Sequence, residues 1–255
     1  MFLNQAGLSC PTGKIFKINQ MDDAIAFIRE IGWPVVIKPV SSSKGDQVYA
    51  NIKNEDLIKE IWAKIFSHHK EYLVEKYFVG SDYRFFATVE KVVAVTNRIP
   101  ANVTGNGEHT ISQLIEAKNS QPDQFVKIII DDVLLKKLSA QDMSSDSVPR
   151  SDEKVFLRDN ANLSTGGELV DVTDLASEEF KQIAVKAVRS IPGLMYAGVD
   201  IIASDIKNSP SSDNYTIIEL NASASIAMHQ FPPEGKPRDV AGAIVDLMFP
   251  ETKGE

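Results

Sequence analysis

The pattern of the chain changes at Gly80, and this change limits the folds that the sequence can adopt. Before Gly80, two amphipathic helical segments alternate with three short apolar strands over roughly residues 10–78. After it, DYRFFATVE and KVVAVTNRIPANV predict a hairpin that turns near Glu90 and Lys91. We therefore predict an α+β protein with two lobes, residues 1–78 and residues 79–255.

The remaining elements follow from spacing and from end signals. In the first lobe we expect helices over 21–32 and 54–69, with Gly32 as a stop and Asn54 as a cap. In the second lobe we expect helices over 110–119, 131–141, 177–191 and 237–249. Strands are expected within 154–172, and the segments 196–206 and 215–222 are expected to pair.

Bulk properties exclude several classes of function. The formal net charge of −8 argues against binding to nucleic acid, although a local basic pocket for a small anion stays open. No apolar run reaches membrane-spanning length. A single cysteine, Cys10, permits no intrachain disulfide and fits a cytoplasmic protein. The P-loop, the dinucleotide-binding glycine motif, the H-E-x-x-H zinc motif and the G-x-S-x-G elbow are all missing from the sequence.

Near the C-terminus, an apolar strand carries a carboxylate and an amide just before it ends. Glu219 and Asn221 are two residues apart, so a strand directs both side chains to one face, with Ile218 and Leu220 on the other. Asp200 lies on the preceding strand and would complete a set of three oxygen donors, as Mg²⁺ prefers. The alternative is an ordinary edge strand with its polar face in water.

The first half offers separate pieces of an anion or nucleotide site. Lys38 ends a buried strand, where it needs an anion or a carboxylate as partner. The loop SSSKG follows, with hydroxyls, backbone N–H groups and Lys44 able to cover phosphates. Tyr77 and Phe78 lie beside backbone edges that an adenine ring could use, and Asp82 could accept from ribose hydroxyls. Each piece alone has an ordinary structural explanation, and their order carries the argument.

That order resembles the ATP-grasp ligases. The segments GWPVVIKP, SSSKG, YLVEKYFVGSDYR, RDNANLSTGG, GVD and IIELNAS have the succession and spacing of this superfamily, over nearly the whole chain. LRDNANLSTGGELVDVTD and MHQFPPEGKPRDVAGAIVDLMFP are similar to the ATP-grasp modules of cyanophycin synthetases and bifunctional glutathione synthetases. The resemblance implies an ATP-grasp fold, with a nucleotide cleft between two α+β lobes.

The resemblance also implies roles for individual residues. At the nucleotide it implies Lys38 on the α- and β-phosphates, Ser42, Ser43 and Lys44 in a closing loop, Glu75, Lys76 and Phe78 at adenine, and Asp82 at the ribose. For two Mg²⁺ ions, or Mn²⁺, it implies Asp200, Glu219 and Asn221, and at the reacting carboxylate it implies Arg158 and Asn162. Arg84 and Arg98 stay open between carboxylate contacts and structural pairing, and His229 between the acceptor side and a strand end.

The implied activity is ATP-dependent ligation of a carboxylate to an amine, with an acyl phosphate intermediate and with amino acids or peptides as substrates. The resemblance implies a further domain at the start of such proteins, which we expect this chain to lack, and so we expect a homodimer or a partner subunit to supply the rest of the acceptor site. The alternative is a nucleotide-binding subunit that is inactive without such a partner.

Overall fold

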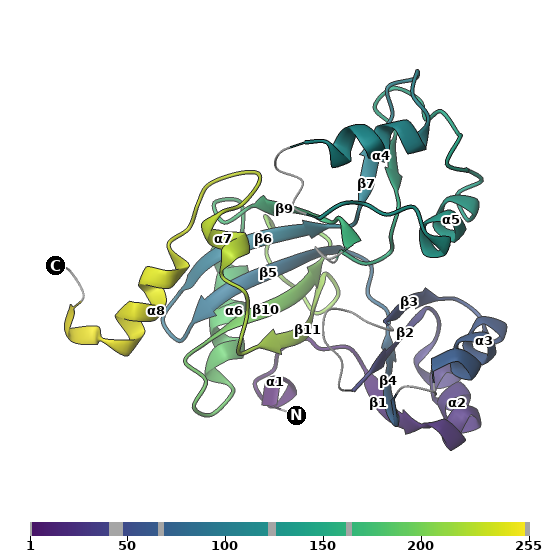
Figure 1. Ribbon diagram of the computed structural model, residues 1–255. Coiled ribbons are helices and arrows are strands. Elements are labelled where there is room, and N and C mark those ends of the chain that lie inside the picture. The colour runs from purple at the N-terminus through teal and green to yellow at the C-terminus, as the bar shows by residue number, and fades with distance from the viewer. Residues whose placement is uncertain (1, 41–47, 66–68, 122–125, 162–164, 253–255) are drawn as a thin grey trace.

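The computed structural model describes residues 2–40, 48–65, 69–121, 126–161 and 165–252, which form three β-sheets with their helices (Figure 1). A four-stranded sheet comes first along the chain, a five-stranded sheet occupies the centre, and a two-stranded sheet forms a smaller unit. In Figure 1, the four-stranded sheet and the smaller unit lie toward the same end of the central sheet.

The first sheet has the order β1-β4-β2-β3, with neighbouring strands antiparallel. Its strands are β1 (Gly13–Lys17), β2 (Val35–Pro39), β3 (Tyr49–Ile52) and β4 (Glu71–Lys76). Helices α2 (Met21–Ile31) and α3 (Glu55–Ile65) bury Ile25, Ile28, Ile58 and Trp62 in the same core as strand residues such as Val35 and Val74. A short helix, η1 (Ile18–Gln20), joins β1 to α2. The sequence pattern predicted β2, β3 and β4 but not β1.

The end of α2 and the start of α3 lie where the sequence predicted them, whereas α3 is described only to Ile65 and His69 is not helical. Helix α2 ends at Ile31, and Gly32 follows with φ 77°, a conformation that glycine adopts without the steric cost that other residues bear. Before α3, the Asn54 Oδ1 atom accepts a hydrogen bond from the Leu57 N–H at 3.0 Å. Both end signals act locally, so a single sequence suffices to read them.

The central sheet has the order β11-β10-β5-β6-β9 and is antiparallel throughout. Its strands are β5 (Ser81–Thr88), β6 (Val92–Ile99), β9 (Glu168–Asp171), β10 (Tyr196–Ala203) and β11 (Tyr215–Asn221). The predicted hairpin is β5–β6, and the predicted pair is β10–β11, so both are confirmed. Helix α6 (Glu178–Arg189) begins at its predicted cap, Ser177, whose side chain accepts from the Phe180 N–H.

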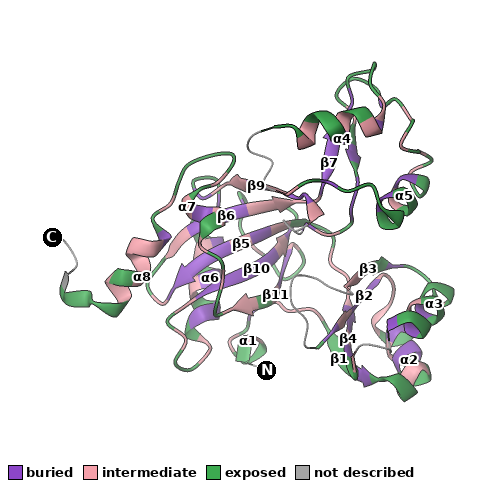
Figure 2. Ribbon diagram, viewed as in Figure 1, coloured by how far each residue is buried: buried purple, intermediate pink, exposed green. Residues whose placement is uncertain are grey.

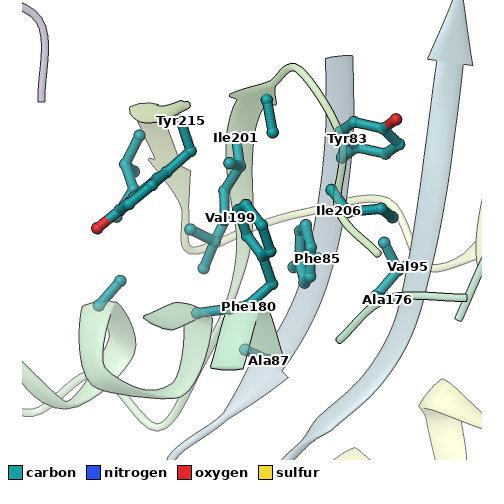
Figure 3. Close-up of a cluster of buried hydrophobic side chains, with 14 of the residues drawn as sticks. Tyr83, Phe85, Ala87, Val95, Ala176, Phe180, Val199, Ile201, Ile206 and Tyr215 are labelled. Carbon is teal, nitrogen blue, oxygen red and sulfur yellow. The ribbon is translucent and has the colours of Figure 1, made fainter. Parts of the chain in front are cut away.

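Helix α6 covers one face of this sheet. Figure 3 shows Phe180 of α6 against Phe85, Val199 and Tyr215 of the strands, and the Phe85 and Phe180 rings stack with their centroids 6.4 Å apart. Helix α1 (Phe2–Gln5) and the residues after it join this core, since Leu8 is buried in it. The first residues of the predicted 1–78 lobe therefore pack with the second lobe.

The smaller unit lies between β6 and β9 in the sequence and has a core of its own. It consists of β7 (Asn102–Thr104), α4 (Ile111–Asn119), α5 (Asp132–Ser139) and β8 (Lys154–Phe156), around buried residues such as Val103, Leu134 and Val155. Strand β8 pairs with β7 and not with β9, although β8 and β9 follow each other in the sequence. The predicted second lobe thus contains two packed units.

The second face of the central sheet is partly covered by the C-terminal segment. Helices α7 (Ala227–Gln230) and α8 (Val240–Met248) lie beside the apolar end of this face, where Val240 packs with Phe86 and Ala94. A final turn, η3 (Pro250–Thr252), follows α8. Figure 2 shows buried residues along β5, β6 and β10, while the outer faces of the helices are exposed. None of the helices in the described residues is both long enough and apolar enough to cross a lipid bilayer.

Candidate active site

The other end of the second face is polar and lies where β5 enters the sheet. On β5, Tyr83 and Phe85 contribute to the core beneath α6. Asp82 and Arg84 therefore point to the opposite face, because side chains alternate along a strand. The register places Asp82 opposite Arg98 of β6, and Arg84 opposite Asp200 of β10. Four charged side chains from three adjacent strands meet at this end of the sheet.

Two arginines hold Asp200. The Arg84 guanidinium donates from Nε to Oδ1 and from Nη2 to Oδ2 of Asp200, both at 2.7 Å. Arg98 Nη2 donates to the same Oδ2 at 2.9 Å and to Asp82 Oδ1 at 2.6 Å. Of the two alternatives that the sequence left open for these arginines, the structure shows structural pairing, with the carboxylates of Asp82 and Asp200 as partners. Asp200 is 2% exposed, so this is a buried network.

Glu219 and Asn221 lie next to this network. The β10–β11 register sets Glu219 opposite Asp200 and Asn221 opposite Gly198, with a bulge at Ile218. In the amide orientation that satisfies both of its atoms, Asn221 donates to Glu219 Oε1 at 3.0 Å and accepts from Arg84 Nη2 at 3.1 Å. The structure therefore brings together the three predicted metal ligands, Asp200, Glu219 and Asn221.

The donor chemistry of these three residues fits a hard cation. Glu219 is exposed and Asn221 is half-buried, so a ligand can reach both side chains although one oxygen of each accepts a hydrogen bond. Asp200 is buried, and both of its oxygens accept hydrogen bonds from arginines. Within the described segments, here as elsewhere, three or more His, Cys, Asp or Glu side chains do not gather into a group that could hold a metal ion. A cation at this place would depend on two carboxylates, one amide and further oxygens from a ligand or water.

Gly198 makes room for the arginine fork. It precedes Asp200 by two residues on β10 and so faces the same side of the sheet. A Cβ atom at this position would lie 2.7 Å from Ala224 Cβ and 3.3 Å from Arg84 Cδ. A larger residue would push against the stem of Arg84, so the glycine in the sequence GVD is part of the geometry that pairs Arg84 with Asp200.

Lys38 has the carboxylate partner that a lysine at the end of a buried strand requires. Its Nζ lies 2.6 Å from Oε1 of Glu75, on the adjacent strand β4. Glu75 is buried, while the lysine is partly exposed. Lys76 directs its Nζ to the carbonyl of Trp33 at 2.7 Å, and its backbone N–H binds Thr12 O at 2.9 Å. Phe78, in the connection between β4 and β5, is half-buried.

Comparison with known proteins places this geometry in a family. Residues 1–121 match the ATP-binding domain of the carbamoyl-phosphate synthase L chain, and residues 150–245 match the RimK-like ATP-grasp domain. Cyanophycin synthetase of Geminocystis herdmanii is 36% identical over 98% of this chain and 29% of its own length. The bifunctional protein GshAB of Pasteurella multocida is 33% identical over 98% of this chain and 34% of its own length. This chain is an ATP-grasp domain.

Solved structures agree with that assignment. The crystal structure of a bifunctional glutathione synthetase from Pasteurella multocida matches 98% of this chain and 35% of its own, with 32% identity and a TM-score of 0.67. The ATP-grasp ligase PsnB, in complex with a phosphomimetic precursor variant, Mg and ADP, matches 99% of this chain and 56% of its own, with 19% identity and a TM-score of 0.53. The ATP-grasp domain described here thus spans about a third of the length of the curated relatives.

Arg158, predicted at the reacting carboxylate, lies in the smaller unit of the ATP-grasp domain. It is buried and donates from Nη2 to Asp131 Oδ2 at 2.9 Å and to the Ile129 carbonyl at 3.2 Å. Asp131 caps α5, so Arg158 stabilises the start of that helix. None of these contacts joins Arg158 to the Asp200 network. Its predicted partner Asn162, and the loop residues Ser42, Ser43 and Lys44, lie outside the described residues.

Asp82, which belongs to the network, and His229, which lies near it, have shifted pKa values. Burial raises the pKa of Asp82 to about 6, although Arg98 opposes the shift, and the charge of Asp200 adds to it. Burial and the charge of Arg84 lower the pKa of His229 to about 4, so this imidazole is neutral near pH 7. His229 Nδ1 pairs with Thr96 Oγ1 at 2.8 Å, and its ring meets Phe86 edge-on. The sequence did not reveal this placement, because it depends on how α7 packs on β6.

Proposed function

We propose that this ATP-grasp domain catalyses ATP-dependent ligation of a carboxylate to an amine on amino-acid or peptide substrates. The observation that carries the proposal is the juxtaposition of Asp200, Glu219 and Asn221 with Arg84 and Arg98 at one end of the sheet. This combination offers oxygen donors for a cation and guanidinium groups for anions. The names of the relatives, cyanophycin synthetase and glutathione biosynthesis protein, support amino-acid substrates.

In the proposed reaction, the substrate carboxylate attacks the γ-phosphorus of ATP and ADP leaves. The amine nitrogen then attacks the acyl carbon, and phosphate leaves as the amide forms. Glu219 and Asn221 would hold a divalent cation together with Asp200, and that cation would neutralise charge on the phosphates. Lys38, now paired with Glu75, would exchange that carboxylate for a phosphate oxygen. No protein nucleophile is required, so positioning and charge stabilisation supply the catalysis.

A second candidate is a nucleotide-binding subunit that acts only with a partner chain. This chain aligns with less than a third of the length of the cyanophycin synthetases, so the activity that their name states is that of a longer protein. A homodimer or a separate subunit would then contribute to the acceptor site. ATP binding without amine-dependent ADP release, under a wide set of acid and amine pairs, would support this candidate over the first.

The test of the proposed function is Glu219→Ala in an assay of ADP release with amino-acid and dipeptide pairs. Glu219 is exposed and makes a single amide contact, so its removal should leave the fold intact while ADP release falls by roughly 100-fold or more. Glu179→Ala, an exposed glutamate on α6 at the other face of the sheet, is the matched control. Full ADP release by Glu219→Ala would reject the cation site. Asp200→Ala is a poorer test, because Asp200 also holds two buried arginines.

A further inference from the structure

We propose that Asp200 is unavailable to metal ions until a nucleotide arrives, because Arg84 and Arg98 occupy both of its oxygens. When a cation takes Asp200, a released guanidinium passes to a phosphate of the nucleotide. This inference rests on the proposed function for its nucleotide step. It makes the two arginines positioning residues that couple metal binding to nucleotide binding.

The geometry closes Asp200 to a cation on its own. Three charge-assisted hydrogen bonds of 2.7, 2.7 and 2.9 Å reach its two oxygens, and the residue is 2% exposed. Mg²⁺ and Mn²⁺ need direct or water-bridged access to a carboxylate oxygen. Glu219 offers such access and Asp200 does not. Without nucleotide, the buried carboxylate of Asp200 therefore binds the arginines and not a cation.

Displacement of these arginines by a cation alone would carry a large cost in free energy. The side chains of Arg84 and Arg98 are 13% exposed, so a guanidinium that lost Asp200 would be left as a buried charge without its counter-ion. Arg98 would keep Asp82, whereas the fork of Arg84 binds Asp200 alone among the ion pairs of the described residues. A triphosphate with its cation brings both replacements together, a cation for Asp200 and an anion for Arg84.

The same network joins two parts of the predicted nucleotide site. Arg98 Nη2 bridges Asp82 Oδ1 and Asp200 Oδ2, at 2.6 and 2.9 Å. Asp82 is the predicted ribose contact, and Asp200 is the predicted metal ligand. A change of partner at either carboxylate alters what Arg98 offers to the other. The two occupancies are therefore coupled through one guanidinium.

The experiment measures Mn²⁺ binding by the loss of the free-ion electron paramagnetic resonance signal, without nucleotide and with ADP. We expect weak binding by the wild type without nucleotide. We expect Arg84→Gln to bind Mn²⁺ roughly 10-fold or more tightly than the wild type in the same nucleotide-free titration. Arg238→Gln is the matched control, because Arg238 makes the same kind of fork on Asp171 at the opposite edge of the sheet. It should leave Mn²⁺ affinity unchanged.

The double variant Arg84→Gln/Glu219→Ala should lose the gain and so locate the ion at this site. If Arg84→Gln does not fold, Arg84→Lys answers the same question, since a lysine cannot fork both oxygens. A folded Arg84 variant that binds Mn²⁺ no more tightly than the wild type would overturn the proposal. If the Arg84 variant gains Mn²⁺ affinity but neither it nor the wild type binds ADP, the proposal that the arginines keep metal ions from Asp200 is supported and the proposed function is rejected.

Discussion

Replacing Asp200 by alanine tests whether the arginine network stabilises the fold as the geometry indicates. The substitution removes a carboxylate that accepts hydrogen bonds of 2.7, 2.7 and 2.9 Å from two arginines. It leaves both guanidiniums in a place where only 13% of each side chain is exposed. The cost is therefore that of breaking a buried ion pair from one side, and not that of losing a surface salt bridge.

The size of the effect follows from which arginine keeps a partner. Removal of one partner of a buried pair typically costs about 3–5 kcal/mol, because the remaining charge is uncompensated. Arg98 keeps Asp82, and Arg84 keeps only the amide of Asn221, so we expect about 3–4 kcal/mol in the free energy of unfolding. For a chain of this size, this corresponds to a fall of about 6–15 °C in the unfolding midpoint.

The assay is thermal and urea unfolding at one pH, with Asp174→Ala as the control. Asp174 also has two cationic partners, Lys236 at 2.6 Å and Arg238 at 3.0 Å, but its side chain is 53% exposed. Solvent screening makes such pairs weak, so the control should have the same unfolding midpoints in temperature and in urea as the wild type. Asp200→Asn, which retains an acceptor oxygen but no charge, should fall between the two. Equal midpoints for Asp200→Ala and Asp174→Ala would refute the reasoning.

Two further predictions concern the pH dependence of stability, measured as the difference between variant and wild type. The pKa of Asp82 is about 6 in the folded state and 3.8 in the unfolded state, so the folded state binds this proton more tightly. Asp82 therefore favours folding at low pH. Its contribution to the free energy of unfolding falls by at most about 3 kcal/mol as the pH rises from 4 to 6. Asp82→Asn should remove that slope and lose more stability toward acid than the wild type does. His229 acts with the opposite sign, because the unfolded state binds its proton near 6.5 and the folded state near 4, so its contribution is present above pH 6.5 and is lost as pH falls. His229→Gln should therefore lose less stability toward acid, and parallel difference curves for the two variants would contradict both assignments.

Local signals made most of the four-stranded sheet with its helices, and part of the central sheet, predictable from the sequence. The caps of α2, α3 and α6 and the β5–β6 turn depend on neighbouring residues only. Strand β1 escaped prediction because Phe16 is its one buried residue, so GKIFK shows no alternation of buried and exposed positions. It becomes a strand through pairing with β4, about sixty residues later. That pairing has no local signature.

The smaller unit could not be predicted for a similar reason. The predicted second strand of the hairpin extends through Asn102 and Val103, but these residues belong to β7, which pairs with β8 across about fifty residues of sequence. Both strands are only three residues long. Their pairing is stabilised by a core that α4 and α5 complete. Periodicity shows that each helix has an apolar face, but it does not show which strands the face will cover.

At the candidate site, the sequence predicted which side chains lie on the same face of a strand, but not which side chains the arginines contact. The spacing of two residues correctly put Glu219 and Asn221 on one face, and the predicted β10–β11 pairing brought Asp200 beside them. The register that sets Arg84 opposite Asp200 depends on how distant strands pair. The sequence alone therefore could not decide between structural pairing of the arginines and contacts with a substrate carboxylate. For Arg158, the short contacts to Asp131 and Ile129 likewise arise from the packing of α5.

Apart from the exposed Glu219, the charged side chains described at the candidate site are paired with one another, and this pairing constrains what can bind. Asp200 neutralises Arg84 and shares Arg98 with Asp82, while Glu75 neutralises Lys38. A polyanion alone would draw the two arginines away and leave Asp200 as a buried carboxylate without a counter-ion. A cation alone would take the carboxylates and leave the guanidiniums unpaired. A phosphate ligand that carries its own divalent cation would satisfy both sets of groups, so under the proposed function we expect the site to bind the metal–nucleotide complex more tightly than either component.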